Sequence, residues 1–193
     1  MKNICVFCGS NLGSDTIYEQ QAEELGALIA QHNIRLIYGG GNIGLMGAIA
    51  DSVLVNGGEV TGVIPEFLMK REVGHSNLTE LILTNSMHER KLKMAELADA
   101  FIAMPGGYGT LEELAEITTW VQLELMKKPI GVLNVNGFYN HLFDQINYMK
   151  SQNFIGKNSN EEILFENNPK DLLSKIIMKA EEMSGNETNL FNS

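Results

Sequence analysis

The sequence contains few cysteines, few basic residues and no long apolar run, and each shortage excludes a class of protein. Its only cysteines, Cys5 and Cys8, lie three apart on one expected strand. Such side chains point to opposite faces, so we expect two buried, reduced thiols rather than a disulfide. The 14 basic residues stand against 24 acidic ones, and the net charge of -10 opposes nucleic-acid binding. No segment approaches the ~20 apolar residues that cross a bilayer, and residues 1–7 lead into strand-like sequence rather than a signal peptide, so we expect a cytoplasmic protein with no membrane partner.

The chain does contain a regular alternation of strand-like and helix-length segments. Hydrophobic residues make up 44% of its 193 residues, which is enough for the core of one domain. The alternation predicts an α/β, Rossmann-like fold with a mostly parallel sheet of about seven strands and helices on both faces. The expected strands are Asn3–Cys8, Arg35–Tyr38, Glu59–Ile64, Leu81–Thr84, Ala100–Met104, Pro129–Leu133 and Ile163–Phe165. The expected helices are Ser14–Gln31, Gly44–Asn56, Ser86–Leu97, Thr110–Leu125, Tyr139–Gln152 and Pro169–Met183. We expect a single domain over residues 1–183 and a frayed, polar tail over residues 184–193.

Glycine-rich loops follow three of the expected strands. They are Cys8–Ser14, Gly39–Gly47 and Pro105–Gly109. Ligands of open parallel sheets bind outside the carboxyl ends of the strands, so the three loops together predict one nucleotide-sized pocket. The first two loops supply the pocket candidates Gly9, Ser10, Gly40, Gly41 and Gly44.

The third loop predicts a phosphate-binding corner. The run Met104–Glu113 places a glycine turn between an apolar strand and an acidic helix start. Glycines let the main chain approach an anion closely, and a helix N-terminus supplies roughly half a positive charge to hold it. We therefore expect a phosphorylated ligand at this corner.

The second loop also contains the pattern G-x-G-x-x-G at Gly39, Gly41 and Gly44, which is typical of dinucleotide-binding folds. Here the pattern follows the second strand rather than the first, and only Glu59 or Glu66 stands where a ribose-binding acid is expected. Nicotinamide or flavin binding therefore remains an alternative.

A polar segment opens the expected helix over residues 86–97. Ser86 followed by Glu89 is the pattern of a capping box, which leaves Arg90 and Lys91 in the first turns. Basic side chains there oppose the helix dipole unless an anion lies nearby. Arginine offers a planar fork to phosphate or carboxylate, and lysine offers a mobile point charge. A solvated charged face is the alternative, and the neighbouring Met87 is a further pocket candidate.

Two carboxylates, Glu112 and Glu113, lie at the start of the helix that follows the third loop. The helix dipole alone favours carboxylates there by about 0.3–1 kcal/mol. Beside a bound phosphate, however, a carboxylate is tolerable only if it faces another part of the ligand, such as a ribose. In glycosidic cleavage the sugar carbon gains positive charge, which a carboxylate stabilises while it orients a water molecule.

These motifs give the chain a resemblance to the LONELY GUY (LOG) family from the first loop to about residue 154. Residues 105–113 fit the family signature P-G-G-x-G-T-x-x-E, and residues 87–91 fit its M-H-x-R-K segment. Residues 8–10 and 39–47 also follow the family pattern. The resemblance implies a phosphoribohydrolase that releases an adenine-type base and ribose 5-phosphate from a nucleoside 5′-monophosphate. Many similar sequences have been labelled lysine decarboxylases, but no lysine here has an evident site for the pyridoxal phosphate Schiff base that decarboxylation would need.

The resemblance also implies roles for individual residues. Arg90 and Glu113 are implied to be catalytic, and residues 107–110 are implied to hold the phosphate. The implied substrate-binding residues are Glu72, Arg90, Lys91, Gly106, Gly107, Tyr108, Gly109, Thr110, Leu111, Glu112, Glu113 and Thr119. The family forms dimers with the active site near the subunit interface, so we expect a homodimer. The histidines lack metal-ligand spacing, and we expect neither a metal nor an organic cofactor.

Other functions remain open at this point. A non-catalytic nucleotide or cofactor carrier would need the glycine loops but not Arg90 and Glu113. A deoxyribosyl transferase would use similar chemistry with an acceptor base. AMP and an N6-prenylated relative differ only around the base, where the sequence does not decide between them.

Overall fold

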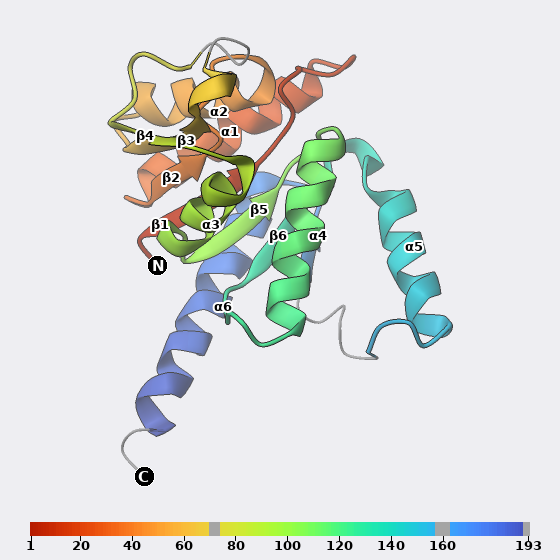
Figure 1. Cartoon of the computed structure of the whole chain (residues 1–193). Helices are drawn as coiled ribbons and strands as arrows, with labels where there is room; N and C mark the ends of the chain where they lie inside the picture. Colours follow the sequence, from red (N-terminus) through yellow and green to blue (C-terminus); the bar gives the residue numbers. More distant parts are fainter. Residues whose placement is uncertain (70–73, 157–162, 191–193) are drawn as a thin grey trace.

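The computed structural model describes residues 1–69, 74–156 and 163–190. A parallel seven-stranded sheet forms the centre of the fold (Figure 1). The strand order is β4-β3-β2-β1-β5-β6-β7, and every pairing between these strands is parallel. The strands are β1 (Asn3–Phe7), β2 (Arg35–Tyr38), β3 (Val60–Pro65), β4 (Glu80–Thr84), β5 (Ala100–Ala103), β6 (Ile130–Leu133) and β7 (Ile163–Glu166). The predicted strands are confirmed, each to within one residue at either end.

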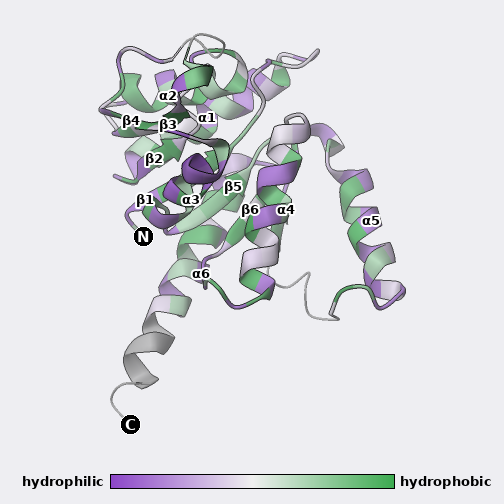
Figure 2. Ribbon diagram, viewed as in Figure 1, coloured by the Kyte–Doolittle hydropathy of each residue, from purple (hydrophilic) through white to green (hydrophobic). Residues whose placement is uncertain are grey.

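Helices cover both faces of the sheet, as predicted. They are α1 (Ile17–Gln31), α2 (Gly44–Val55), α3 (Met87–Leu97), α4 (Tyr108–Gln122), α5 (Asn140–Ser151) and α6 (Pro169–Leu190), with 3-10 turns η1 (Glu66–Leu68) and η2 (Val135–Gly137). Helices α1, α2 and α6 share one apolar core with the sheet, and α3 and α4 share another on the opposite face. Figure 2 shows hydrophobic colour on β5 and β6 between these layers. Cys8 belongs to the first core and Cys5 to the second, so both thiols are buried and unpaired.

The strand order reverses between β1 and β5. Chain connections run from β1 toward β4 on one side of this point and from β5 toward β7 on the other. The loops that follow β1 and β5 therefore diverge at the carboxyl edge of the sheet and leave a crevice there, which is where ligands of such folds bind.

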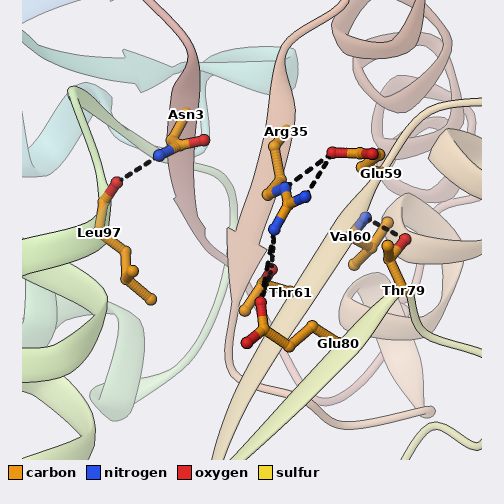
Figure 3. Close-up of polar contacts among 8 residues, drawn as sticks. All are labelled: Asn3, Arg35, Glu59, Val60, Thr61, Thr79, Glu80 and Leu97. Atoms are coloured by element: carbon orange, nitrogen blue, oxygen red, sulfur yellow. Dashed lines mark hydrogen bonds and ion pairs between the residues drawn. The ribbon is translucent and has the colours of Figure 1, made fainter.

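At the amino ends of the strands, opposite the glycine loops, a network of polar contacts surrounds Arg35 on β2 (Figure 3). Its guanidinium donates to Glu59 at 2.5 Å and to Glu80 at 3.4 Å, and the Glu80 carboxylate also accepts from the Thr61 hydroxyl at 3.3 Å. These contacts join β2, β3 and β4 at their amino ends. Glu59 is therefore engaged at the amino ends of the strands, which leaves Glu66 as the remaining candidate for the ribose-binding acid of the dinucleotide hypothesis.

Several predicted helix ends differ from the structure. Helix α1 begins at Ile17 rather than Ser14, and α4 ends at Gln122 rather than Leu125. Helix α4 begins at Tyr108 rather than Thr110, because Gly109 is already part of the helix and Gly107 is its extended N-cap. Helix α6 continues to Leu190 rather than ending at Met183, since no proline interrupts it and an established helix extends at little cost. The Ser86 hydroxyl does accept from the Glu89 N–H at 3.1 Å, but the Glu89 carboxylate accepts from the N–H of Asn85 rather than completing a capping box.

Candidate active site

The amino end of α4 forms an open anion cradle. Gly107 is the N-cap, and no side chain caps this helix end, so the first N–H groups of the helix remain available to a ligand. Open space lies beside Gly107 and Gly109, because a Cβ placed on either would come within 4 Å of no described atom beyond its chain neighbours and the backbone of α4 itself. The Tyr108 side chain is 93% exposed and does not close the cradle. The local geometry thus has the open space, N–H donors and dipole that a phosphate requires.

The three predicted glycine loops lie together at this edge of the sheet. The Gly9 N–H donates to the Pro105 carbonyl at 3.1 Å, and the Gly9 carbonyl accepts from the Leu45 N–H at 3.0 Å. Gly44 has a positive φ of 62°, and a Cβ there would lie within 3.0 Å of the Ser10 backbone. Such contacts need glycine, because a side chain would force the loops apart. Between the first and third loops lies a pocket of about 180 Å³.

Arg90 on α3 is a buried cation beside the second loop. The residue is 5% exposed, and its Nε has no hydrogen-bond partner among the described residues. One Nη atom lies 3.9 Å from the Sδ of Met87, which is a weak acceptor. Gly39 makes room for the guanidinium, because a Cβ there would lie within 3.0 Å of the other Nη atom. A buried charge without a strong partner is costly, which favours an anionic ligand or carboxylate at this position.

Glu113 approaches the same region from α4, where it is half-buried. Its influence is visible at Cys8, the residue after β1. Burial raises the pKa of the Cys8 thiol far above its ordinary value, the Glu113 carboxylate raises it further, and the Arg90 guanidinium lowers it. The Cys5 thiol responds to burial and to the same two charges in the same directions. Arg90 and Glu113 therefore both lie close to the carboxyl end of β1.

Lys91 on α3 forms ion pairs with two carboxylates of α4. Its ammonium donates to the Glu112 carboxylate at 2.6 Å and to the Glu116 carboxylate at 3.1 Å. Burial lowers the pKa of Lys91, but the two hydrogen-bonded carboxylates outweigh burial and the net shift is upward. Two residues that were expected in the substrate pocket, Lys91 and Glu112, thus form an ion pair with each other.

Comparison with known proteins identifies the relatives of this site. The family profile described as "Possible lysine decarboxylase" matches residues 46–176. The cytokinin riboside 5′-monophosphate phosphoribohydrolase LOG1 of Arabidopsis thaliana is 47% identical over 175 residues, which cover 91% of this chain and 82% of LOG1. The chain belongs to the LOG family. The phosphoribohydrolase LOG of Oryza sativa subsp. japonica is 46% identical over 175 residues, covering 91% of this chain and 72% of that protein.

Solved structures share the LOG fold at lower sequence identity. The molybdenum cofactor binding protein of Rippkaea orientalis has a TM-score of 0.68 and 24% identity, with 92% of this chain and 98% of that chain covered. The Moco carrier protein of Chlamydomonas reinhardtii has a TM-score of 0.70 and 18% identity, with 94% and 98% covered. At these identities the likeness shows the fold alone.

The remaining predicted residues of this LOG chain lie in different places. The Thr119 hydroxyl donates to the Ala115 carbonyl at 2.8 Å, on the exposed side of α4 and away from the cradle. Glu72 lies outside the described residues. Its neighbours are tied to the second loop, since the His75 N–H donates to the Gly40 carbonyl at 3.1 Å and Gly74 pairs with Gly41.

Gly39 was expected only as part of a glycine pattern, and its place beside Arg90 was not predicted. Its close approach to Arg90 depends on the packing of α3 against β2, which no local pattern encodes. Among residues 1–69, 74–156 and 163–190, no group of three or more His, Cys, Asp or Glu side chains is placed to hold a metal ion. The same part of the chain contains no helix long and apolar enough to cross a membrane.

Proposed function

We propose that this protein is an N-glycosidase that hydrolyses adenine-type nucleoside 5′-monophosphates, AMP or N6-substituted cytokinin nucleotides, to the free base and ribose 5-phosphate. The observation that carries the proposal is that buried Arg90 and half-buried Glu113 both act on Cys8, at the carboxyl end of β1, while Glu113 belongs to the helix whose amino end forms the open cradle. A carrier would need the cradle but not a carboxylate next to it. The names of the relatives, phosphoribohydrolases at 46–47% identity, agree with this choice.

In the proposed reaction, the N–H groups at the start of α4 hold the 5′-phosphate and place the ribose over Glu113. The bond between the ribose C1′ and the base nitrogen breaks, and its electron pair leaves with the base, which takes up a proton. Glu113 stabilises the positive charge that develops on C1′ and accepts a proton from the water molecule that attacks it. Arg90 orients the carboxylate and the phosphate, for which its planar fork is suited.

The description "Possible lysine decarboxylase" fits the site less well. A pyridoxal phosphate enzyme needs a lysine that can lose its proton and form a Schiff base. Lys91, the lysine beside Arg90, is held by two carboxylates that raise its pKa and keep it charged. We therefore assign Lys91 to anchoring α3 on α4 and to shaping the pocket.

A homodimer belongs to the same proposal. An apolar groove of about 380 Å³ lies between α4 and α5, with Leu111, Ala115 and Leu142 among its lining residues. Helix α5 buries none of its residues completely, although it carries apolar side chains into this groove. A second copy of the chain would cover this surface, and sedimentation equilibrium would test it. We place the dimer in the cytoplasm.

The dimer would also allow Thr119, whose contact with substrate only the family resemblance implies, to reach a bound nucleotide. At a rise of roughly 1.5 Å per residue, Thr119 lies about 13 Å along α4 from Thr110 at the cradle, which is farther than a ribose held there would extend. Thr119 also lines the groove. In this proposal Thr119 of one protomer contacts the substrate bound to its partner. Mixing Glu113→Gln with Thr119→Ala protomers should then create a site with normal KM, whereas a contact within one protomer predicts no such site.

The test of the proposed function separates binding from turnover. Glu113→Gln removes the charge without removing volume, so it should keep AMP binding within a few-fold and lose at least about a hundredfold in kcat. Glu96→Gln, an exposed carboxylate on α3 paired with Lys93, is the control and should keep normal turnover. Equal activity of Glu113→Gln and the native protein would refute the catalytic assignment of Glu113.

A further inference from the structure

The turn that leads from β5 into the phosphate cradle is held at two consecutive carbonyls. The Tyr139 hydroxyl donates to the Met104 carbonyl at 2.7 Å, and the Gly9 N–H donates to the Pro105 carbonyl at 3.1 Å. Regular pairing of β5 with β6 ends at Ala103, and the sheet holds Met104 only through its N–H, which donates to the Phe7 carbonyl of β1 at 2.8 Å. The Met104 carbonyl is held by Tyr139 instead. The two hydrogen bonds set the direction in which the chain enters Gly106 and Gly107.

Tyr139 is itself firmly placed by the connection between β6 and α5. The residue is 1% exposed, and its N–H donates to the side-chain oxygen of Asn134 at 2.7 Å. The Asn134 amide in turn donates to Asn140 at 2.9 Å. The Tyr139 and Phe138 rings form a T-shaped pair with centroids 4.9 Å apart. The hydroxyl is therefore a fixed donor, and burial raises the pKa of Tyr139, which keeps its proton in place.

We propose that Tyr139 is a positioning residue for the phosphate cradle, which acts by fixing the Met104 carbonyl and thereby the N–H groups at the start of α4. The inference rests on the proposed function, because it requires that these groups bind phosphate. Tyr139 touches no substrate in this proposal. Its loss should weaken the binding of phosphorylated ligands more than it slows the chemical step.

The test is Tyr139→Phe, which removes one oxygen atom and keeps the buried ring. We expect the Kd for ribose 5-phosphate, measured by calorimetry, to rise about fivefold, the factor that corresponds to one neutral hydrogen bond. The KM for AMP should rise by a similar factor, while kcat at saturation changes by less than about twofold. Thr61→Val is the matched control. It removes a buried hydroxyl that bonds to Glu80 at the opposite edge of the sheet, so it should lower stability and leave Kd unchanged.

The outcomes separate the inference from the proposed function. A native protein that binds no ribose 5-phosphate would refute the phosphate cradle and the proposed function with it. A native protein that binds it, with an unchanged Kd for Tyr139→Phe, would overturn the positioning role alone. The positioning role is also refuted if Tyr139→Phe and Thr61→Val lower the unfolding temperature equally and neither alters Kd or KM.

Discussion

Gly39 provides a sharp prediction, because the structure gives it a steric reason to lack a side chain. A Cβ at this position would lie within 3.0 Å of an Arg90 Nη atom and at 3.2 Å from both the Arg90 Cζ and the Met46 Sδ. Real Cβ atoms essentially never come within 3.0 Å of a heavy atom outside their own and the neighbouring residues, so one of the two groups must move. The clashing group is the far end of a flexible side chain. Gly39→Ala should therefore displace the guanidinium rather than unfold the protein.

We expect Gly39→Ala to lower turnover rather than stability. Loss of a charge-assisted hydrogen bond from the transition state costs about 1.5–3 kcal/mol, so kcat/KM for AMP should fall roughly 10- to 150-fold. Stability should change by less than about 1 kcal/mol, or roughly 2–4 °C in the unfolding temperature. The assay is free-base release by chromatography, together with thermal unfolding followed by circular dichroism.

Gly131→Ala is the matched control for this experiment. A Cβ on Gly131 would meet the ends of the Ile176 and Leu172 side chains at 2.5 and 2.8 Å, in the core under α6. The crowding is similar, but Arg90 is not involved, so we expect a stability loss with normal kcat/KM for the folded enzyme. Full activity of Gly39→Ala, or equal activity losses in the two variants, would refute the reasoning about Arg90.

Three further predictions concern groups around the site. Cys5 and Cys8 are buried and their pKa values are raised, so both thiols should be unreactive toward a disulfide reagent at about pH 8 in the folded protein. Both should react after denaturation, and rapid labelling of the native protein would contradict this prediction. Lys91→Met should destabilise the protein by roughly 1 kcal/mol near neutral pH, measured by urea unfolding. Folding raises the pKa of Lys91 above 10.5, so the stability difference between the native protein and Lys91→Met should persist below pH 10.5 and vanish as the pH rises beyond the folded-state pKa. A stability difference that does not change with pH would contradict this prediction. His75→Ala should cost about 2–3 kcal/mol, since the buried ring bonds to Asp51 and accepts an N–H, and a loss below about 0.5 kcal/mol would show that these bonds are unimportant.

The fold was largely predictable because its signals are local. Apolar runs such as Ala100–Ala103 are bounded by turns, and the glycine loops follow them directly. The start of α4 and the end of α6 were less predictable, because the ends of a helix depend on the residues that cap or extend it. The glycines before Thr110 favoured a loop by composition, yet Gly107 is the N-cap of α4 and Gly109 lies within the helix.

The candidate site was only partly predictable, because its contacts join distant segments. Arg90 could be chosen for its place in an anion-binding motif, but its dependence on Gly39 arises from packing. Lys91 was expected to bind an anion in the same way, whereas the structure pairs it with Glu112 across two helices. Tyr139 carried no local signal at all, because its partner is a backbone carbonyl 35 residues away in the chain.

The most direct test of the proposed function is the release of free base from AMP, isopentenyladenosine monophosphate and adenosine, followed by chromatography. The proposed function predicts release of base and ribose 5-phosphate from one or both monophosphates and none from adenosine, because the cradle at the start of α4 reads the phosphate. Release from adenosine at the same rate would contradict the role of the cradle. Absence of release from all three compounds, with AMP still bound, would contradict hydrolysis and identify a carrier.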